Sequence, residues 1–204
     1  MEKQVRRLGV YGGTFSPPHL GHMHAAEVFL SEGGIDALFV IPTFTTPLKE
    51  RDEATSPEDR LAMCRLAFSF SSRIFVSDIE IQRAGKSYTA QTLTALSAPD
   101  TLLSFLCGTD MFLSMDSWYH PETIFQLAEI VCMRREDERE KEAMLLAKAE
   151  EYQSLYGARI RFLTAPPMAM SSSEIRARIR SNEPLSAYLI PSVEAYICEK
   201  GLYR

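Results

Sequence analysis

The chain has 204 residues, of which 46% are hydrophobic and 24% are charged, and its formal net charge is −5. This composition is typical of a globular domain with a continuous core, and no apolar run approaches the roughly 20 residues that cross a bilayer. The acidic balance argues against non-specific nucleic-acid binding, which needs a basic face, and the start of the chain does not resemble a secretory signal. We therefore expect a cytoplasmic protein without membrane or nucleic-acid partners.

Four cysteines are scattered along the chain without a Cys-x-x-Cys pair: Cys64, Cys107, Cys132 and Cys198. In a chain of this length, we expect them to be small buried side chains of a reducing compartment. A disulfide framework or a zinc site would require closer or more regular spacing.

Short β-type runs alternate with amphipathic helical stretches in the first half of the chain. The expected order is a strand over 5–11, a helix over 20–30, a strand over 37–41, a polar loop over 43–56, a helix starting at 56–59, strands over 74–76 and 79–81, and a turn at Gly85. The helix start has Ser56 at the cap and Pro57 at the first helical position, followed by acids in the first turn. This combination is the usual signature of a helix N-terminus.

The same alternation continues in the second half of the chain. We expect a helix over 89–96, a buried strand over 101–107, a short helix over 121–127, a strand over 130–133, a solvated surface helix over 136–156, a strand over 160–163, and helices starting near 173 and 191. This order predicts an α/β fold with a mainly parallel sheet and helices on both faces. No repeat or linker divides the sequence, so we expect a single domain over 1–204.

The most informative segment is Gly12-Gly13-Thr14-Phe15-Ser16-Pro17-Pro18-His19-Leu20-Gly21-His22. It lies where the first expected strand passes into the first expected helix, the place where open α/β sheets bind ligands. Two glycines allow backbone amides to approach a phosphate, and the helix N-terminus adds a partial positive charge. A helical turn would place His19 and His22 on one face. The alternative interpretation is a glycine- and proline-rich turn with two incidental histidines.

This segment resembles the signature of the adenylyl- and cytidylyltransferase superfamily, His-x-Gly-His after Gly-Gly-Thr-Phe. Histidine at position 19 is more similar to the nicotinate-nucleotide adenylyltransferases than to the pantetheine-phosphate branch, which has threonine there. The family commonly has Asp or Asn where this chain has Ser16. The resemblance implies a Rossmann-like nucleotidyltransferase domain in which His19 and His22 are catalytic. The ATP phosphates would contact the preceding residues, Gly12, Gly13, Thr14 and Phe15.

A second cluster is Met170-Ser171-Ser172-Ser173-Glu174-Ile175-Arg176. By itself, serine followed by glutamate within a turn predicts only a helix cap. The segment is also similar to the family's Ile-Ser-Ser-Thr-x-Ile-Arg motif, which implies that Ser172, Ser173 and Arg176 bind the triphosphate of ATP. Free amides, hydroxyls and a guanidinium at one helix start form a suitable anion site.

Two stretches in the middle of the chain extend the resemblance. Lys86-Ser87-Tyr88-Thr89 is similar to the Ser-Tyr-Thr segment that lines the family's pyridine pocket, and Gly108-Thr109-Asp110 with Trp118-Tyr119 is similar to its Gly-x-Asp…Trp stretch. The resemblance implies that Thr89, Trp118 and Tyr119 bind the mononucleotide, with Trp118 stacked on the pyridine ring. It also implies that Gly108 and Asp110 contact the nucleotide, with Asp110 on ribose hydroxyls. A core aromatic is the alternative role for Trp118.

Two cations and the C-terminal segment complete the comparison. Lys49 matches a family lysine that reaches phosphate, with a solvated loop lysine as the alternative. Arg134, at the end of an expected strand, is expected to face the mononucleotide. The segment from Tyr188 through Tyr196 to Tyr203 is similar to the C-terminal end of bacterial nicotinate-nucleotide adenylyltransferases and is expected to be structural.

The resemblance implies that the chain transfers the adenylyl group of ATP to nicotinate mononucleotide. The products would be nicotinate adenine dinucleotide and pyrophosphate, in NAD biosynthesis. The attacking phosphate oxygen is already an anion, so we expect catalysis by positioning and charge neutralisation, without a covalent intermediate. Mg²⁺ is expected to accompany ATP through phosphate oxygens and water, without a metal site built from protein side chains.

Two alternatives to this function stay open. One is the same chemistry on another acceptor, such as the amide mononucleotide or phosphopantetheine. The other is a nucleotide-sensing module that keeps the fold without turnover, although intact His19, His22 and Arg176 weigh against it. Pyrophosphate release from ATP with a panel of acceptors would discriminate these cases. The sequence leaves open whether the chain forms a homo-oligomer.

Overall fold

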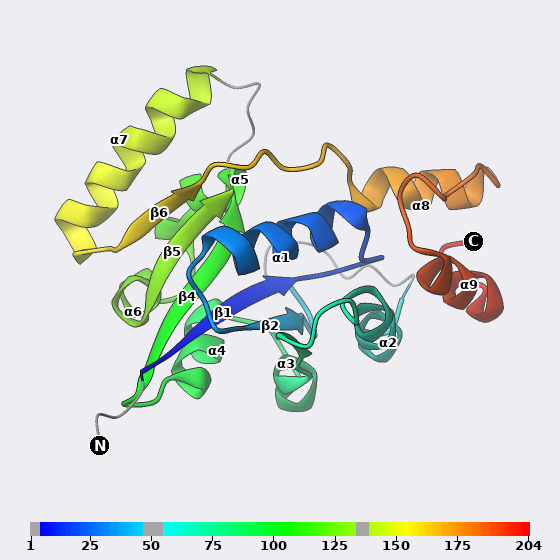
Figure 1. The fold of residues 1–204 in the computed structure, drawn as a ribbon, viewed down its shortest axis with the longest axis horizontal. Coiled ribbons are helices and arrows are strands. Elements are labelled where there is room, and N and C mark those ends of the chain that lie inside the picture. The colour runs from blue at the N-terminus through cyan, green and yellow to red at the C-terminus, as the bar shows by residue number, and fades with distance from the viewer. Residues whose placement is uncertain (1–4, 47–54, 134–138) are drawn as a thin grey trace. The chain divides into compact units, whose positions relative to one another are not determined.

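The computed structural model describes residues 5–46, 55–133 and 139–204, in which strands and helices alternate (Figure 1). The strands are β1 (Arg6–Gly13), β2 (Ala37–Pro42), β3 (Ile74–Val76), β4 (Thr101–Gly108), β5 (Ala128–Met133) and β6 (Ile160–Leu163). The helices are α1 (Leu20–Glu32), α2 (Pro57–Ala67), α3 (Ile79–Arg83), α4 (Thr89–Leu96), α5 (Thr109–Leu113), α6 (Pro121–Leu127), α7 (Arg139–Tyr156), α8 (Ser172–Arg180) and α9 (Pro191–Lys200), with the 3₁₀ turn η1 (Met115–Ser117).

One six-stranded sheet has the strand order β3-β2-β1-β4-β5-β6. This is the order of the Rossmann-like folds, so the expected α/β fold class is confirmed. The order reverses between β1 and β4, and sheets of this kind bind ligands beyond the carboxyl ends of the strands at that point.

The chain forms two compact units, each assembled from separate segments. Unit 1 comprises Met1–Tyr11, Glu27–Leu38 and Tyr88–Pro167, and unit 2 comprises Gly12–Ala26, Phe39–Ser87 and Met168–Arg204. Three of the five boundaries fall inside β1, α1 and β2, so no linker in the sequence would mark those three. A single domain over 1–204 stays a prediction.

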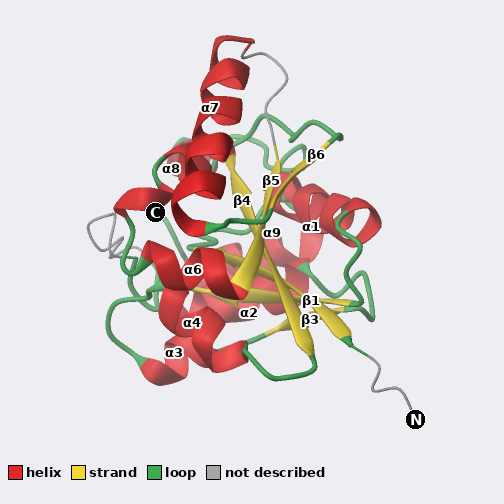
Figure 2. Cartoon of the chain, turned by 90° about the vertical axis from the view of Figure 1, so that its left-hand side faces the viewer, coloured by secondary structure: helices red, strands yellow, loops and turns green. Residues whose placement is uncertain are grey.

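Parallel pairing organises the strands of unit 1, drawn in yellow in Figure 2. β1 pairs with β4, β4 with β5, and β5 with β6. Residues 103–107 of β4 are all buried, as expected for a parallel strand covered on both faces. The register places Cys107 opposite Cys132.

A glycine on β1 allows close packing within unit 1. A Cβ atom at Gly9 would lie 2.4 Å from Ile35 Cδ1 and 2.8 Å from Phe29 Cε1, on the C-terminal half of α1. A side chain at this position would require Ile35 and Phe29 to shift, so glycine lets this segment approach the strand closely.

Helix α7 has a buried stripe, which corrects the expectation of a solvated surface helix over 136–156. Leu145, Ala149 and Tyr152 are 3%, 6% and 0% exposed, and their spacing of four and three residues places them on one side of the helix. In unit 1, α7 packs against α5 and α6. The other sides of the helix carry charged residues and alanines, so the short buried stripe is not recognisable in the sequence. Residues 136–138 lie outside the described part of the chain.

Unit 2 contains the helix start that the sequence predicts most specifically. Ser56 Oγ accepts a hydrogen bond from the Asp59 backbone N–H at 3.0 Å, and Pro57 is the first residue of α2. Helix α2 packs against β3 and α9, and the Tyr196 hydroxyl on α9 donates to Asp59 Oδ1 at 2.8 Å.

Residues 79–81 are helical, so the strand expected there is wrong. The Ile-Glu-Ile alternation favours a strand, but Asp78 closes a helical turn instead. Its carbonyl accepts from the Gln82 N–H at 2.8 Å, and its carboxylate accepts from Gln82 Nε2 at 2.9 Å.

The short elements α5 and η1 were not expected. Apart from the start of α7, the other expected elements are present with ends within two residues.

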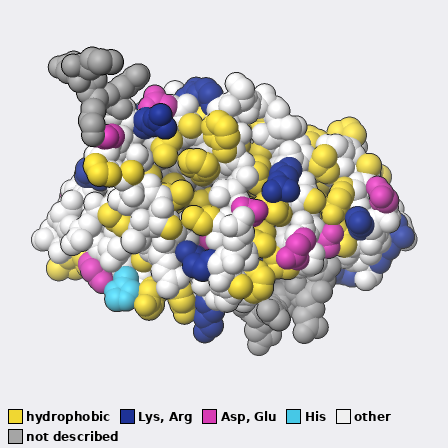
Figure 3. Space-filling view, turned by 90° about the horizontal axis from the view of Figure 1, so that it is seen from below, with side chains coloured by type: hydrophobic (Ala, Val, Ile, Leu, Met, Phe, Trp, Pro, Cys, Tyr) yellow, Lys and Arg dark blue, Asp and Glu magenta, His cyan; other side chains and the backbone are white. Residues whose placement is uncertain are grey.

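Charged side chains are dispersed over the face of the molecule that Figure 3 shows, where lysines and arginines lie among acidic and apolar groups. Among the described residues, no helix is long and apolar enough to cross a membrane. Cys64, Cys107 and Cys132 are buried thiols as predicted, whereas Cys198 is exposed and corrects that prediction.

Candidate active site

The loop between β1 and α1, in unit 2, turns its aromatic residue inward. Phe15 is 2% exposed and has a φ of 50°, in the left-handed region that non-glycine residues rarely adopt. Its ring lies 3.0 Å from the position that a Cβ atom on Gly13 would take. Glycine at position 13 therefore lets the Phe15 ring fold back on the backbone, and this packing holds the unusual φ.

Hydrogen bonds from backbone N–H groups to ring nitrogens link His19 and His22. The His19 N–H donates to His22 Nδ1 at 3.2 Å, and the His22 N–H is shared between His19 O at 2.9 Å and His19 Nδ1 at 3.3 Å. Their rings stack with centroids 3.6 Å apart at 25°, and Phe15 meets the His22 ring edge-to-face at 5.0 Å. Because each Nδ1 atom accepts a hydrogen bond, each neutral ring carries its proton on Nε2. The pair thus presents two Nε2–H donors on fixed rings.

Burial keeps these imidazoles neutral. Burial lowers the pKa of His19 from 6.5 to about 4. Burial also lowers the pKa of His22 well below its usual range, and the proximity of His19 lowers it further. An anion bound beside them would oppose both effects, because it favours the protonated form.

Two arginines fix the carbonyl groups of the same loop. Arg60, on α2 and only 5% exposed, donates from Nη1 to Thr14 O at 2.8 Å and from Nη2 to Phe44 O at 3.0 Å. Arg176, on α8, donates to Ser16 O at 2.7 Å. A trans peptide directs its N–H opposite to its C=O, so the bond to Thr14 O turns the Phe15 N–H away from Arg60.

The start of α8 joins the loop in unit 2. Ser171 caps the helix by accepting from the Glu174 N–H at 3.2 Å, as the sequence predicts for this cluster. Ser172 Oγ donates to Pro17 O at 3.0 Å, so this hydroxyl holds the loop. The Gly21 N–H lies 3.1 Å from Met170 Sδ. Ser173 is exposed in the first turn of the helix.

The C-terminal segment also contacts the loop. Ser16 is 2% exposed, and its Oγ lies 3.2 Å from the hydroxyl of Tyr203, which is 4% exposed. Ser16 thus reaches the C-terminal tyrosine.

Unit 1 holds the predicted residues Gly108, Asp110, Thr89, Trp118 and Tyr119. Gly108 ends β4, and Asp110 follows in the first turn of α5. Thr89 opens α4, so its N–H has no acceptor within that helix. Trp118 is half-buried and meets Phe105 edge-to-face at 6.2 Å. Among the described residues, its indole Nε1 is buried without a hydrogen-bond partner, which is unusual for a tryptophan.

Tyr119 belongs to an aromatic cluster. Its ring lies 4.3 Å from that of Tyr88 and 4.2 Å from that of His120, which in turn bonds Glu122 at 2.8 Å. Tyr119 is 46% exposed, so the cluster is open to solvent. Thr109 Oγ1, between Gly108 and Asp110, is a second buried polar atom without a partner among the described residues.

The sequence patterns did not predict some of the residues that support the site. Two residues that they did predict lie outside the described part of the chain. Unit 2 brings together residues 12–22, Ser172 and Arg176, and adds Arg60 and Tyr203 in supporting roles. Arg60 lies in an amphipathic helix and belongs to no sequence motif. The one feature that could have indicated its role is that an arginine occupies a position among buried residues. Lys49 and Arg134 lie outside the described residues.

Known proteins match this chain over nearly its whole length. The cytidylyltransferase-like family model matches residues 10–178. A probable nicotinate-nucleotide adenylyltransferase of Desulfatibacillum aliphaticivorans is 36% identical, over 97% of this chain and 99% of the relative. One from Lachnoclostridium phytofermentans is 32% identical, over 98% and 100%. The structure of Plasmodium falciparum nicotinic acid mononucleotide adenylyltransferase complexed with NaAD has a TM-score of 0.77 at 20% identity, covering 97% of both chains.

The buried imidazole of His19 predicts a loss of stability in mild acid. Its pKa is lower in the folded chain than in the unfolded chain, so the unfolded chain binds more protons between pH 6.5 and about 4. Its stabilising contribution is complete above pH 6.5 and is lost as the pH falls. Between pH 7.5 and 5 we expect a loss on the order of 2 kcal/mol from this group.

Urea unfolding at the two pH values measures this effect. His19→Gln should lose less stability than the wild type over the interval. Equal losses in the wild type and His19→Gln would contradict the assignment.

Proposed function

Because the chain belongs to the cytidylyltransferase-like family and matches nicotinate-nucleotide adenylyltransferases over its full length, we propose that it transfers the adenylyl group of ATP to nicotinate mononucleotide. The products are nicotinate adenine dinucleotide and pyrophosphate, and the reaction belongs to NAD biosynthesis. The observation that carries this proposal is the pair of buried, mutually bonded histidines beside a glycine loop whose carbonyls are fixed by arginines.

The geometry suits an in-line displacement at the α-phosphorus. A phosphate oxygen of the mononucleotide attacks, the bond to the β-phosphate oxygen breaks, and pyrophosphate leaves. The nucleophile is an anion, so no general base is needed. Nε2–H donors on fixed rings stabilise charge that builds up on the phosphate oxygens, because they need no reorganisation during the reaction. Such donors also hold the reacting groups in line.

The triphosphate is assigned to the loop of residues 12–15 and to the start of α8. Ser173 is exposed at the N-terminus of α8, where the partial positive charge of the helix favours phosphate. Arg176 would add charge at this place while holding Ser16 O. Lys49 is proposed as a further phosphate ligand.

The mononucleotide and the nucleoside are assigned to residues of unit 1. The face of the Trp118 indole would stack on the pyridine ring. The Trp118 Nε1 and Thr109 Oγ1 atoms, which have no hydrogen-bond partner among the described residues, are suited to a ligand with polar groups. Backbone N–H groups near Thr89 and Tyr119 would bond the nicotinate carboxylate. Gly108 and Asp110 would contact the nucleotide, and Arg134 is proposed to face the mononucleotide.

Mg²⁺ is proposed to enter with ATP. The side chains assigned to phosphate in the loop and at the start of α8 are imidazoles, hydroxyls and a guanidinium, which suit phosphate oxygens better than a hard cation, and the carboxylate of Glu174 in the first turn of α8 pairs with Arg178. The ion would therefore be held by phosphate oxygens and water, where it neutralises phosphate charge. We further propose that the enzyme acts in the cytoplasm on these two small substrates. Self-association is left open.

Removing the His22 imidazole should slow the reaction strongly. We expect His22→Ala to keep the fold and to lose at least roughly 100-fold in kcat, the usual effect of removing one charge-stabilising donor. His24→Ala, two residues further along α1, is the matched control and should lose far less. Pyrophosphate release from ATP and nicotinate mononucleotide measures both. A folded His22→Ala enzyme within a few-fold of the wild type would remove His22 from the chemistry.

Arg176 should affect ATP more than the mononucleotide. Arg176→Lys keeps the charge but loses the planar fork, so one group can no longer hold Ser16 O and also bond phosphate. We expect the KM for ATP to rise more than the KM for the mononucleotide, and Arg176→Ala to be worse. Arg178→Lys is the control on the same helix, because Arg178 pairs with Glu174 and Glu183. A KM rise on the mononucleotide alone would move Arg176 to the other substrate.

Acceptor choice should favour nicotinate over nicotinamide mononucleotide. Nicotinate carries a carboxylate where nicotinamide carries an amide, and backbone N–H donors satisfy only the former. A mismatched buried polar contact costs about 1–3 kcal/mol, so we expect at least roughly ten-fold higher kcat/KM with nicotinate mononucleotide. Trp118→Ala should weaken both acceptors alike, since stacking does not sense the substituent. Steady-state kinetics with both acceptors measure this preference. Equal efficiency would overturn the assignment of nicotinate mononucleotide as the acceptor and would leave the adenylyl transfer itself unaffected.

A further inference from the structure

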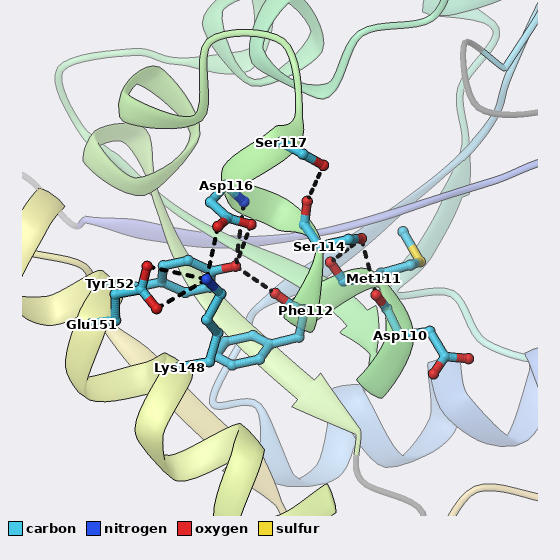
Figure 4. A network of polar contacts seen from close by, with 9 residues as sticks. All are labelled: Asp110, Met111, Phe112, Ser114, Asp116, Ser117, Lys148, Glu151 and Tyr152. Atoms are coloured by element: carbon cyan, nitrogen blue, oxygen red, sulfur yellow. Dashed lines mark hydrogen bonds and ion pairs between the residues drawn. The ribbon is translucent and has the colours of Figure 1, made fainter.

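The segment that carries Trp118 is tied to helix α7 by a polar network in unit 1 (Figure 4). The Tyr152 hydroxyl donates to Phe112 O at 2.9 Å and accepts from the Asp116 N–H at 3.3 Å. Lys148, one turn earlier on α7, donates to Asp116 Oδ2 at 2.7 Å. Two side chains of α7 therefore hold both ends of the segment 112–116.

The segment beyond Asp116 is short and internally bonded. Ser117 Oγ donates to Ser114 O at 2.7 Å, and the Trp118 N–H donates to Met115 O at 3.1 Å. Trp118 follows Asp116 by two residues, so a shift of η1 would turn the indole relative to Phe105, its edge-to-face neighbour.

The network is partly sheltered from solvent. Tyr152 is fully buried, and burial raises the pKa of its hydroxyl to about 12, so the group stays protonated. The side chains of Lys148 and Asp116 are 20% and 35% exposed. The hydrogen bond from Lys148 lowers the pKa of the Asp116 carboxyl and keeps that group ionised. Lys148 also bonds Glu151, which is 44% exposed and provides a control on the same lysine.

We propose that Lys148 and Tyr152 are positioning residues for the mononucleotide, which act through Asp116 to set the orientation of Trp118. The proposal rests on the proposed function, because that function assigns the pyridine ring to Trp118. Lys148 and Tyr152 need not touch a substrate, and their effect should appear in acceptor binding rather than in the chemical step.

Trp118 fluorescence tests the positioning directly, because the chain has a single tryptophan. Lys148→Met removes the charge and keeps the side chain's length. We expect its tryptophan emission to shift to the red and its quenching by acrylamide to increase relative to the wild type. In kinetics, the KM for nicotinate mononucleotide should rise roughly 3- to 30-fold, the range of mutations within such networks. The KM for ATP and kcat should stay within about two-fold of the wild type.

Matched variants separate positioning from general loss of structure. Glu151→Gln, which alters only the exposed partner of Lys148, should leave emission and both KM values unchanged, and Lys148→Arg should restore most of the acceptor affinity. Tyr152→Phe should reproduce the emission change, and it replaces Lys148→Met if that variant does not fold. Unchanged emission and quenching in folded Lys148→Met and Tyr152→Phe would overturn the proposal. A parallel rise of both KM values would do the same, because it would indicate a merely structural role.

Different results would contradict the proposed function and the proposed positioning of Trp118. If the wild type releases no pyrophosphate with any mononucleotide, the proposed function fails and the assignment to a mononucleotide falls with it. The emission of Lys148→Met still decides in that case whether α7 orients Trp118.

Discussion

The reciprocal hydrogen bonds between His19 and His22 are the constraint on which the proposed phosphate site depends. Each backbone N–H occupies the Nδ1 atom of the other residue's ring, which leaves the proton of each neutral imidazole on Nε2. Burial lowers the pKa of both rings and so favours their neutral form. The site is therefore built of donors whose direction is set before the substrate binds, and such preorganisation is what charge stabilisation in a transition state requires.

The rest of unit 2 supports this pair. Phe15 packs on His22, and arginines from α2 and α8 fix the loop carbonyls at Thr14 and Ser16. Arg60 is almost fully buried, and its hydrogen bonds to Thr14 O and Phe44 O help to offset the cost of desolvating it. Unit 1 uses a comparable arrangement, in which buried Tyr152 holds the segment before Trp118. Both halves of the proposed reaction thus rely on side chains that hold the residues assigned to the substrates.

The sequence predicts the parts of this structure that depend on local chemistry. The cap at Ser56, the glycines that end β1 and the cap at Ser171 are recognisable because neighbouring residues produce these features. Contacts between distant segments are not readable in this way. Arg60, Tyr203 and Tyr152 act on partners far away in the chain, and no spacing rule connects them to the site. At residues 79–81 a local pattern gave a wrong prediction. Their alternation favours a strand, but the helical turn closed by Asp78 overrides it.

The stereochemistry at the α-phosphorus tests most directly whether these groups catalyse adenylyl transfer by positioning alone. One diastereomer of adenosine 5′-(α-thio)triphosphate, incubated with nicotinate mononucleotide and the enzyme, would give a chiral dinucleotide. A single in-line displacement predicts that dinucleotide with inverted configuration. Retention would show two successive displacements and hence a covalent intermediate on the enzyme, and failure to form the dinucleotide from ATP itself would contradict the proposed reaction.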